Sequence, residues 1–329
     1  VLADSISKPK VLNELLQNIE KTELVRSRLR KMLKGVKEPT KNIIDTLIKY
    51  LKIMKDFEDS GFYVSGIIDS KSASSVSKDT LSKYGGLIVY DPKKKKEYVV
   101  KLAWTPKRIV NNKGEAYLKP RVDSGKREKL AEVMQKEVAK ALGIELTVPG
   151  IRRETIGGRE VIFSEYLRDT VQLSESKSSL SKLSKEQTQH VTVLKMMILA
   201  LGNEDAHPTN FLVTKEGGIV GIDNEWALAV LHGPSSFRLD FFKLLANYGV
   251  KDNPQFVKKT LSAFKKLDLD SLIKASGFTG KKAELVKKHL QANLRFLEEN
   301  FKRAQKISDE SKYRVYPSVF FKYEDETYD

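Results

Sequence analysis

Residues 202–224 read GNEDAHPTNFLVTKEGGIVGIDN. Two short apolar runs in this stretch, at 211–213 and 219–222, are separated by a polar turn that ends in two glycines. Short β-branched runs joined by a glycine-containing turn predict a β-hairpin. The first strand follows Asn210 and the second leads into Asp223, so the hairpin would bring these two polar side chains to the same end of a small sheet.

The chain before this hairpin predicts a small antiparallel sheet. Three strands are predicted from short apolar runs bounded by polar turns, at 62–68, 87–90 and 98–103. A helix at 127–142, ended by Gly143 as its C-terminal cap, separates them from a further strand at 159–166. Three consecutive strands favour an antiparallel meander.

Helical periodicity dominates the two ends of the chain. Apolar residues recur at helical spacing over 11–57 and again over 185–201, and the chain beyond Arg238 is expected to be helical to about residue 307. A sheet followed by helices predicts an α+β fold. We expect an N-terminal helical extension at 1–58, a sheet lobe at 59–170 and a mainly helical lobe at 171–329.

The composition excludes several kinds of site. The 329 residues include no cysteine, which rules out disulfides and thiolate catalysis, and the four histidines are too scattered for a zinc site made by the protein alone. No apolar run is long enough to cross a bilayer, so we expect no transmembrane segment. The net charge of +16 indicates either anionic partners or a well-solvated basic surface. The densest basic run, 93–96, lacks interleaved aromatic residues, and we expect no stable nucleic-acid partner.

The polar residues around the hairpin fit the needs of phosphoryl transfer. This reaction requires a carboxylate that orients the attacking hydroxyl, and oxygen ligands for a magnesium ion that bridges the phosphates. Asp205 and Asn210 lie five residues apart on one loop, and Asp223 follows the returning strand. Taken alone, the Asp-x-His-x-x-Asn pattern has a plain alternative, because an aspartate at such a position also caps turns.

The pattern Asp-x-His-x-x-Asn, followed by a short strand pair and Ile-Asp, resembles the catalytic and metal-binding loops of phosphatidylinositol 3-/4-kinases and of HipA-type bacterial kinases. Residues 222–224 with 227–229 are particularly similar to the metal loop of type II phosphatidylinositol 4-kinases. The resemblance implies a bilobal protein-kinase-like fold that uses ATP with Mg²⁺ or Mn²⁺. It implies that Asp205 is the catalytic aspartate and that Asn210 and Asp223 are metal ligands.

The same resemblance assigns roles in the sheet lobe. Lys101, on the third strand, would hold the α- and β-phosphates, and Glu137 on the following helix would pair with it, with Glu132 as the competing candidate. The strand at 159–166 would lead into a hinge whose backbone pairs with adenine, formed by Glu165, Tyr166 and Leu167. Two of these residues also have ordinary explanations, Lys101 as an edge-strand charge and Glu137 as an exposed helix charge.

Two features depart from the family pattern. The loop at 69–83, which would cover the nucleotide, contains no glycine-rich motif. The resemblance to phosphoinositide-type kinases implies phosphate contacts from Ser74, Ser75 and Lys78 of this loop, whereas the alternative is an ordinary surface loop. Glu225 stands where a glycine often follows the metal-binding aspartate, which would alter the metal site.

The segment after Asp223 separates classes of kinase. It is short and contains no Ala-Pro-Glu, which argues against a conventional protein kinase. We therefore expect transfer of the γ-phosphate of ATP to a Ser or Thr hydroxyl of an acidic protein substrate, in the cytoplasm, or in the host cytosol for a secreted effector. A phosphoinositide kinase is the first alternative. A non-catalytic nucleotide-binding scaffold and an enzyme that transfers AMP are the others, and the oligomeric state stays open.

Overall fold

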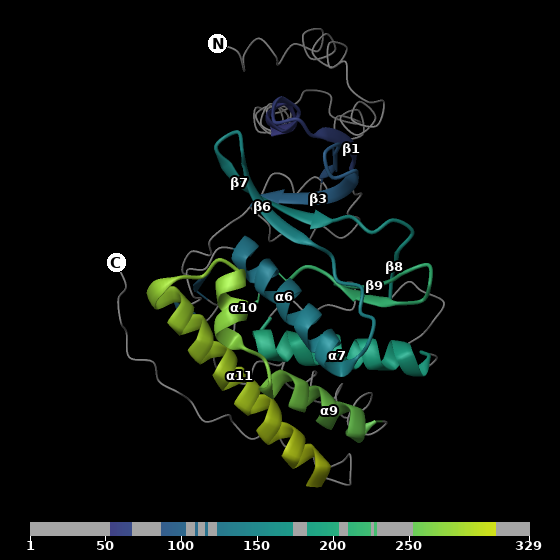
Figure 1. Ribbon diagram of the computed structural model, residues 1–329, viewed down its shortest axis with the longest axis vertical. Helices are drawn as coiled ribbons and strands as arrows, with labels where there is room; N and C mark the ends of the chain where they lie inside the picture. Colours follow the sequence, from purple (N-terminus) through teal and green to yellow (C-terminus); the bar gives the residue numbers. More distant parts are fainter. Residues whose placement is uncertain are drawn as a thin grey trace. The chain divides into compact units, whose positions relative to one another are not determined.

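The computed structural model describes residues 53–67, 87–102, 109–110, 116–117, 124–173, 183–203, 210–224, 227–228 and 253–306 (Figure 1). The chain divides into two compact units, Val1–Ala103 with Gly150–Tyr166 and Trp104–Pro149 with Leu167–Asp329, which we call the sheet unit and the helical unit. The architecture is α+β with an antiparallel sheet, as the sequence predicts. Within the described ranges, no helix is both long and apolar enough to span a bilayer.

Five antiparallel strands form the main sheet of the sheet unit. Their order across the sheet is β1 (Tyr63–Ile67), β2 (Leu87–Asp91), β3 (Lys96–Leu102), β7 (Arg159–Glu165) and β6 (Ile151–Ile156). The predicted meander of β1, β2 and β3 is confirmed, and so is the strand at 159–166.

The strand β6 is absent from the sequence prediction because three charged residues interrupt its apolar pattern. The two-residue turn Gly157–Gly158, which joins β6 to β7, is the signal that would have revealed it. The short pair β4 (Ile109–Val110) and β5 (Ala116–Tyr117) is also unpredicted, since two-residue strands carry no periodicity.

A short helix at 53–59 packs against this sheet. Phe57 is fully buried and meets the rings of Phe62 and Phe163 edge-on, at centroid distances of 6.3 and 6.0 Å. Edge-to-face aromatic pairs add to the stabilisation from buried area. This helix covers the C-terminal end of the predicted extension at 1–58 and lies in the core of the sheet unit, and residues 1–52 lie outside the described residues.

Arg152 on β6 joins this aromatic core to a buried carboxylate. Its guanidinium carbon lies 4.3 Å from the ring centroid of Phe163 and 4.5 Å from that of Tyr98. Its Nη2 donates to the Asp91 carboxylate at 2.8 Å, and Glu154 is a further partner. Because Asp91 is only 3% exposed, Arg152 supplies the positive charge that this buried carboxylate needs.

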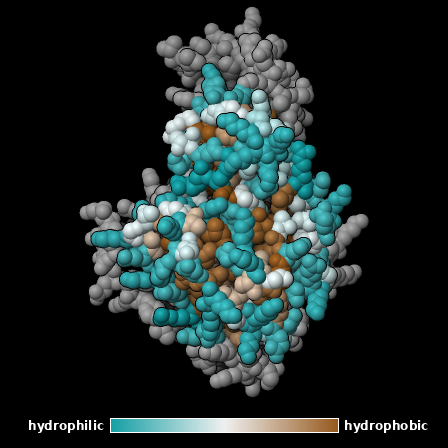
Figure 2. All heavy atoms as spheres, viewed as in Figure 1, coloured by the Kyte–Doolittle hydropathy of each residue, from teal (hydrophilic) through white to brown (hydrophobic). Residues whose placement is uncertain are grey.

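Helices form most of the helical unit (Figure 1). They are α6 (Ser124–Leu142), α7 (Lys185–Leu201), α9 (Pro254–Lys265), α10 (Leu269–Ala275) and α11 (Gly280–Lys306). The predicted helices at 127–142 and 185–201 are confirmed, with Gly143 in the left-handed conformation after α6. On the face shown in Figure 2, hydrophilic side chains cover much of this unit and apolar side chains are visible between them.

The helix α7 is buried along most of its length. A capping box at Ser184 starts it, and Gly202 ends it with a φ of 58°. Every residue from 190 to 201 is buried, which includes one lysine. Burial lowers the pKa of this residue, Lys195, to about 8, so its amine is close to half protonated near that pH.

The position of α6 differs from the predicted domain division, which groups this helix with the sheet lobe. Its apolar residues, among them Leu130, Met134 and Val138, lie in one hydrophobic cluster with residues of α7, α9, α10 and α11. Lys259 of α9 also donates to the carbonyl of Leu142 at the end of α6, at 3.0 Å. These contacts place α6 in the helical unit.

Replacing Arg152 by alanine should destabilise the protein by about 3 kcal/mol or more, because Asp91 would stay buried without its cationic partner. Urea-induced unfolding followed by circular dichroism would measure the loss. Arg159→Ala is the matched control, since this arginine is more exposed and lies 3.6 Å from Asp56; its loss should cost less than about 1 kcal/mol. Equal costs for the two variants would contradict the role assigned to Arg152.

Candidate functional site

The predicted hairpin is present, and it brings Asn210 and Asp223 together. β9 (Phe211–Val213) pairs antiparallel with β10 (Ile219–Gly221), and β8 (Val171–Gln172) completes a three-stranded sheet in the helical unit. Beyond the last ladder pair, the amide of Ile222 donates to the carbonyl of Asn210 at 2.9 Å. Asn210 and Asp223 therefore lie at the same end of the hairpin, as the sequence predicts.

The helix α7 supports this hairpin at its turn and in its second strand. Gln187 Nε2 donates to the carbonyl of Gly217 in the turn at 2.8 Å. The amide of Ile219 lies 3.5 Å from Nδ1 of His190, to which it donates. Burial lowers the pKa of His190, which favours the neutral imidazole that this contact needs.

A close approach of α7 to the second strand continues this support toward Asp223. A Cβ atom at Gly221 would lie 3.0 Å from Cδ2 of Leu194, so the absence of a side chain lets β10 lie directly on the helix. Further along, the amide of Leu228 donates to the carbonyl of Leu201 at 2.6 Å. The C-terminal end of α7 is thus bonded to the chain that follows the hairpin.

The loop that carries Asp205 is anchored at both ends beside Asp223. Asp205 itself lies outside the described residues, but its flanking residues Asn203 and Asn210 are described. Asn203 is buried, and its Nδ2 lies 3.5 Å from Oδ1 of Asn224. Asn210 is bonded to Ile222, as described above. Both ends of the loop thus meet the three-residue segment that contains Asp223.

Asp223 has a backbone conformation that side chains rarely adopt. Its φ is 60°, in the left-handed region, and Leu228 shares this conformation with a φ of 63°. Aspartate tolerates this region better than most residues, whereas a bulky leucine does not. Such backbone persists where the surrounding structure holds it, and it is often found at functional sites. Lys95 and Asp169 also have positive φ values, of 54° and 56°, so the conformation alone assigns no function to Asp223.

Lys101 lies on a partly apolar face of the sheet unit. It pairs with Ile162 across β3 and β7, and its neighbour Val100 points to the opposite, fully buried face. Ile162 is fully buried and Ile88, on the same face, is 9% exposed. Lys101 is half-buried in these surroundings, which differ from those of an edge-strand lysine because β3 is the central strand.

The predicted hinge has two of its three amide groups already bonded. The amide of Glu165 donates to the carbonyl of Gly150, and that of Tyr166 to the carbonyl of Glu97, both at 2.9 Å. The carboxylate of Glu165 accepts from Lys96 Nζ at 2.6 Å. Among the described residues, no hydrogen bond is found for the amide of Leu167, the third of the hinge, and its contact with adenine stays a prediction.

The two candidate glutamates of α6 differ in burial. Glu137, the first choice from the sequence, is exposed. Glu132 is 5% exposed and lies between Lys129 and Lys136, at 2.6 and 2.5 Å from their Nζ atoms. Both carboxylate oxygens of Glu132 are thus paired with lysines of its own helix. The pairing of either glutamate with Lys101 stays a prediction.

Several predicted site residues lie outside the described part of the chain: Asp205, Ser74, Ser75 and Lys78. Their roles stay predictions. Within the described residues, no group of three or more His, Cys, Asp or Glu side chains is arranged to hold a metal ion. The predicted metal ligands, Asn210 and Asp223, are one amide and one carboxylate, so they do not form such a group by themselves.

Sequence reasoning gave no role to Asn203, and it included Asn224 and Leu228 only as part of the resemblance at 222–224 and 227–229. The helix-ending signal at Gly202 could have drawn attention to Asn203, because the residues after a C-cap often bond back to the helix. Its amide does so, donating to the carbonyl of Ile198 at 3.0 Å. The left-handed conformation of Leu228 has no sequence signal.

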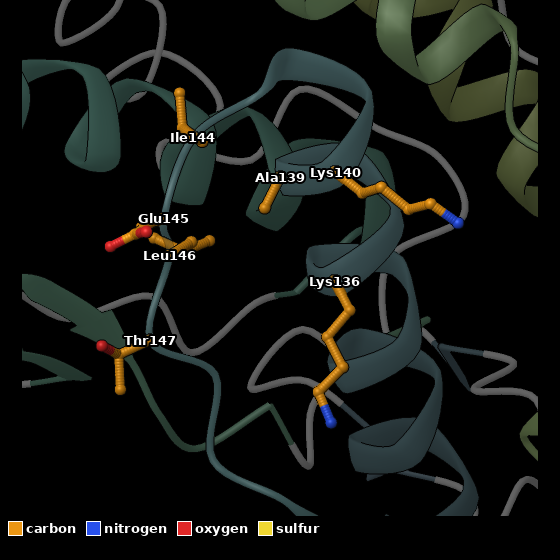
Figure 3. A pocket seen from close by; sticks show the side chains of 7 residues that line it. All are labelled: Lys136, Ala139, Lys140, Ile144, Glu145, Leu146 and Thr147. Atoms are coloured by element: carbon orange, nitrogen blue, oxygen red, sulfur yellow. The ribbon is translucent and has the colours of Figure 1, made fainter.

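An open hollow of about 400 Å³ lies at the end of α6, within the helical unit (Figure 3). It is lined by Lys136, Ala139, Lys140, Ile144, Glu145, Leu146 and Thr147. Figure 3 shows Ala139 facing the extended segment 144–147, whereas Lys140 extends away from it. No predicted site residue lines this hollow, so it is separate from the site at Asp223.

Comparison with known proteins adds no relative to this picture. No protein-family model matches the chain, and no curated protein matches it. The interpretation of the site therefore depends on its own residues and their geometry.

The strain at Asp223 predicts an unusual order of stability among its variants. Asp223→Gly should be more stable than Asp223→Ala by about 1 kcal/mol, because glycine adopts a positive φ without cost. At Asp270, in the first turn of α10, the order should reverse, since glycine weakens a helix by about 1 kcal/mol relative to alanine. Chemical unfolding of the four variants tests both signs, and an alanine variant at least as stable as glycine at Asp223 would refute the strain.

Proposed function

We propose that the chain is a magnesium- and ATP-dependent kinase of the phosphatidylinositol 3-/4-kinase-like or HipA-like type. It transfers the γ-phosphate of ATP to a hydroxyl, with Ser or Thr of a protein as the acceptor. The observation that carries the proposal is the juxtaposition at the end of the β9–β10 hairpin: Asn210 and Asp223 lie together there, and both ends of the loop that holds Asp205 meet the same segment.

The residues of this end fit a magnesium ion that also binds phosphate. Magnesium prefers oxygen ligands and takes one or two carboxylates from the protein, with phosphates and water filling the other positions. Asp223 supplies a carboxylate and Asn210 an amide oxygen, and both side chains are partly accessible. The bound ion would neutralise charge on the phosphates.

The roles of the other residues follow from their chemistry. Asp205 accepts a hydrogen bond from the attacking hydroxyl and orients it toward the γ-phosphate. It stands two residues from Asn203, and two residues of chain span at most about 7 Å, which keeps it close to the anchored end of its loop. Lys101 binds phosphate oxygens, and the amide of Leu167 pairs with the base. A kinase-like bilobal arrangement of the two units is part of this proposal.

A non-catalytic scaffold would bind a partner through its basic surface, and it has no need for Asn210 and Asp223 to lie together at the end of the hairpin. An enzyme that transfers AMP would use the same residues, and the choice between the two reactions is a matter for experiment. The acceptor, protein or phosphoinositide, is likewise an outcome of the test.

Parallel assays with γ-labelled and α-labelled ATP should show transfer of the γ label alone, in the presence of magnesium, to an acidic protein acceptor. Asp205→Ala should reduce transfer by a factor on the order of 1,000 or more while ATP still binds, and Asp223→Ala should also remove magnesium-dependent binding, measured by thermal shift.

Glu216→Ala is the control for this assay, since Glu216 is an exposed carboxylate in the turn at the opposite end of the same hairpin. It should keep full activity. Label transfer from the α position would show that the protein is a nucleotidyl transferase and not a kinase. Labelling of phosphoinositide would show that the acceptor is a lipid and not a protein. Equal activity in all variants would show that Asp205 and Asp223 are not part of the active site.

The kinase proposal gives one glutamate of α6 the role of supporting Lys101, and the buried Glu132 is the candidate tested first. Glu132→Gln should lower kcat/KM for ATP by a factor on the order of 100, through poorer positioning of the lysine, and Glu137→Gln should leave it unchanged. Because Glu132 also bonds Lys129 and Lys136, the rates are compared at temperatures where both variants are fully folded by circular dichroism. A loss of activity with Glu137→Gln alone would restore the exposed glutamate as the partner.

A further inference from the structure

The turn between β2 and β3 presents a compact group of lysines at one end of the sheet unit. Lys93, Lys94 and Lys95 are all exposed, and none of them has a side-chain ion pair or hydrogen bond among the described residues. Together with the neighbouring Tyr63, which is 61% exposed, we call this surface the lysine tip.

The backbone of the lysine tip is held by a single carboxylate. Oδ1 of Asp91 accepts hydrogen bonds from the amides of Lys93 and Lys94, at 2.9 and 3.2 Å. The other oxygen of Asp91 accepts from Arg152. An aspartate that bonds backbone amides two and three residues ahead fixes the turn, so the three lysine side chains start from an ordered backbone.

Two acidic groups at this end of the sheet are already paired with basic residues other than those at 93–95. Asp91 is buried against Arg152, and Glu165 is paired with Lys96. The hydrogen bond and the charge of Glu165 raise the pKa of Lys96, as expected for a committed ion pair. The charges of 93–95 are therefore free to act on an external partner.

An aromatic side chain accompanies these charges. Tyr63 begins β1 and pairs with Tyr90, the residue before Asp91, so it lies at the same end of the sheet as the turn. Tyrosine combines an apolar ring with a polar hydroxyl and favours the boundary between water and lipid.

We propose that the lysine tip docks this protein onto the surface of a membrane that contains anionic phospholipids. Three features favour this partner. The surface is a convex hairpin end, which suits a flat partner. It uses lysine and no arginine, and lysine acts as a point charge, whereas recognition of a carboxylate or phosphate group on a peptide or nucleic acid favours the paired donors of arginine. It carries an interfacial tyrosine.

The expected strength is modest and depends on salt. Each lysine near an anionic bilayer strengthens binding about fivefold, so three lysines contribute a factor of about 100. This attraction falls off within a Debye length of about 8 Å at physiological ionic strength and weakens in higher salt. Docking of this strength is reversible, and it is independent of whether the protein is a kinase.

The test is co-sedimentation of the full chain, without ATP, with vesicles of phosphatidylcholine alone or with about one third phosphatidylserine. The wild-type chain should bind the anionic vesicles and not the neutral ones, and Lys93→Gln/Lys94→Gln/Lys95→Asn should bind them about 100-fold more weakly. The matched control is Lys258→Gln/Lys266→Gln/Lys274→Gln, which removes three exposed lysines of the helical unit and has the same net charge. It should lose less than about threefold.

Equal losses in the two triple variants would overturn the proposal, since binding would then follow net charge and not this surface. Equal binding of neutral vesicles would overturn it as well. So would a tip variant that keeps vesicle binding but loses binding to polyglutamate or to RNA, because the partner would then be a protein or a nucleic acid.

A second measurement tests the proposal without relying on the fold of the triple variant. The chain contains no cysteine, so Lys94→Cys and Lys266→Cys can each carry one environment-sensitive fluorophore. Anionic vesicles should shift the emission of the label at 94 to the blue and leave that at 266 unchanged. The same shift at both positions, or none at 94, would contradict docking through the lysine tip.

Discussion

The contact between α7 and the β9–β10 hairpin is the interaction on which the candidate site depends. A three-stranded sheet with strands of two or three residues has too few hydrogen bonds to be stable alone. The helix provides what the sheet lacks: polar contacts at the turn, close packing at Gly221, and a backbone bond from Leu228 to its last residue. These contacts hold the hairpin in place from its turn to the opposite end, where Asn210 and Asp223 lie.

The core of the helical unit also supports the strain at this end. Ala227 and Leu228 are fully buried in the same hydrophobic cluster as α6, α7, α9 and α11. Burial of a leucine side chain contributes about 2 kcal/mol, which is enough to offset a left-handed backbone at one residue. The unfavourable conformations after β10 are therefore kept by packing at Leu228, although the proposed chemistry concerns Asp223.

Much of the fold was predictable from the sequence, and the reasons for the exceptions are physical. The apolar runs of β1, β2, β3 and β7 and the helices α6 and α7 have clear periods and end signals, such as Gly143 and Gly202. In β6 the apolar pattern is broken because Arg152 uses its charge inside the sheet unit, where an apolar residue is usual. The neighbours of α6 were not predictable either, since the apolar stripe of a helix does not say which surface it meets.

The same distinction holds for the site. The hairpin that joins Asn210 and Asp223 is a local feature, and the sequence predicts it. The choice between Glu132 and Glu137 depends on which face of α6 is buried, and periodicity alone left both open. The amide of Glu165 is bonded to Gly150, just before β6, and that of Tyr166 is bonded to Glu97 of β3. Both bonds arise from the fold as a whole, so local sequence does not predict them.

The turn held by Asp91 has a consequence for how this surface can change in evolution. Its shape depends on one buried carboxylate and two backbone amides, and the side chains at 93–95 take no part in it. Substitutions at 93 and 94 can therefore change charge while the turn keeps its shape. Lys95 has a φ of 54°, so this position best accepts glycine, asparagine or aspartate. In such a turn, folding constrains the backbone and leaves the charge of most side chains to vary.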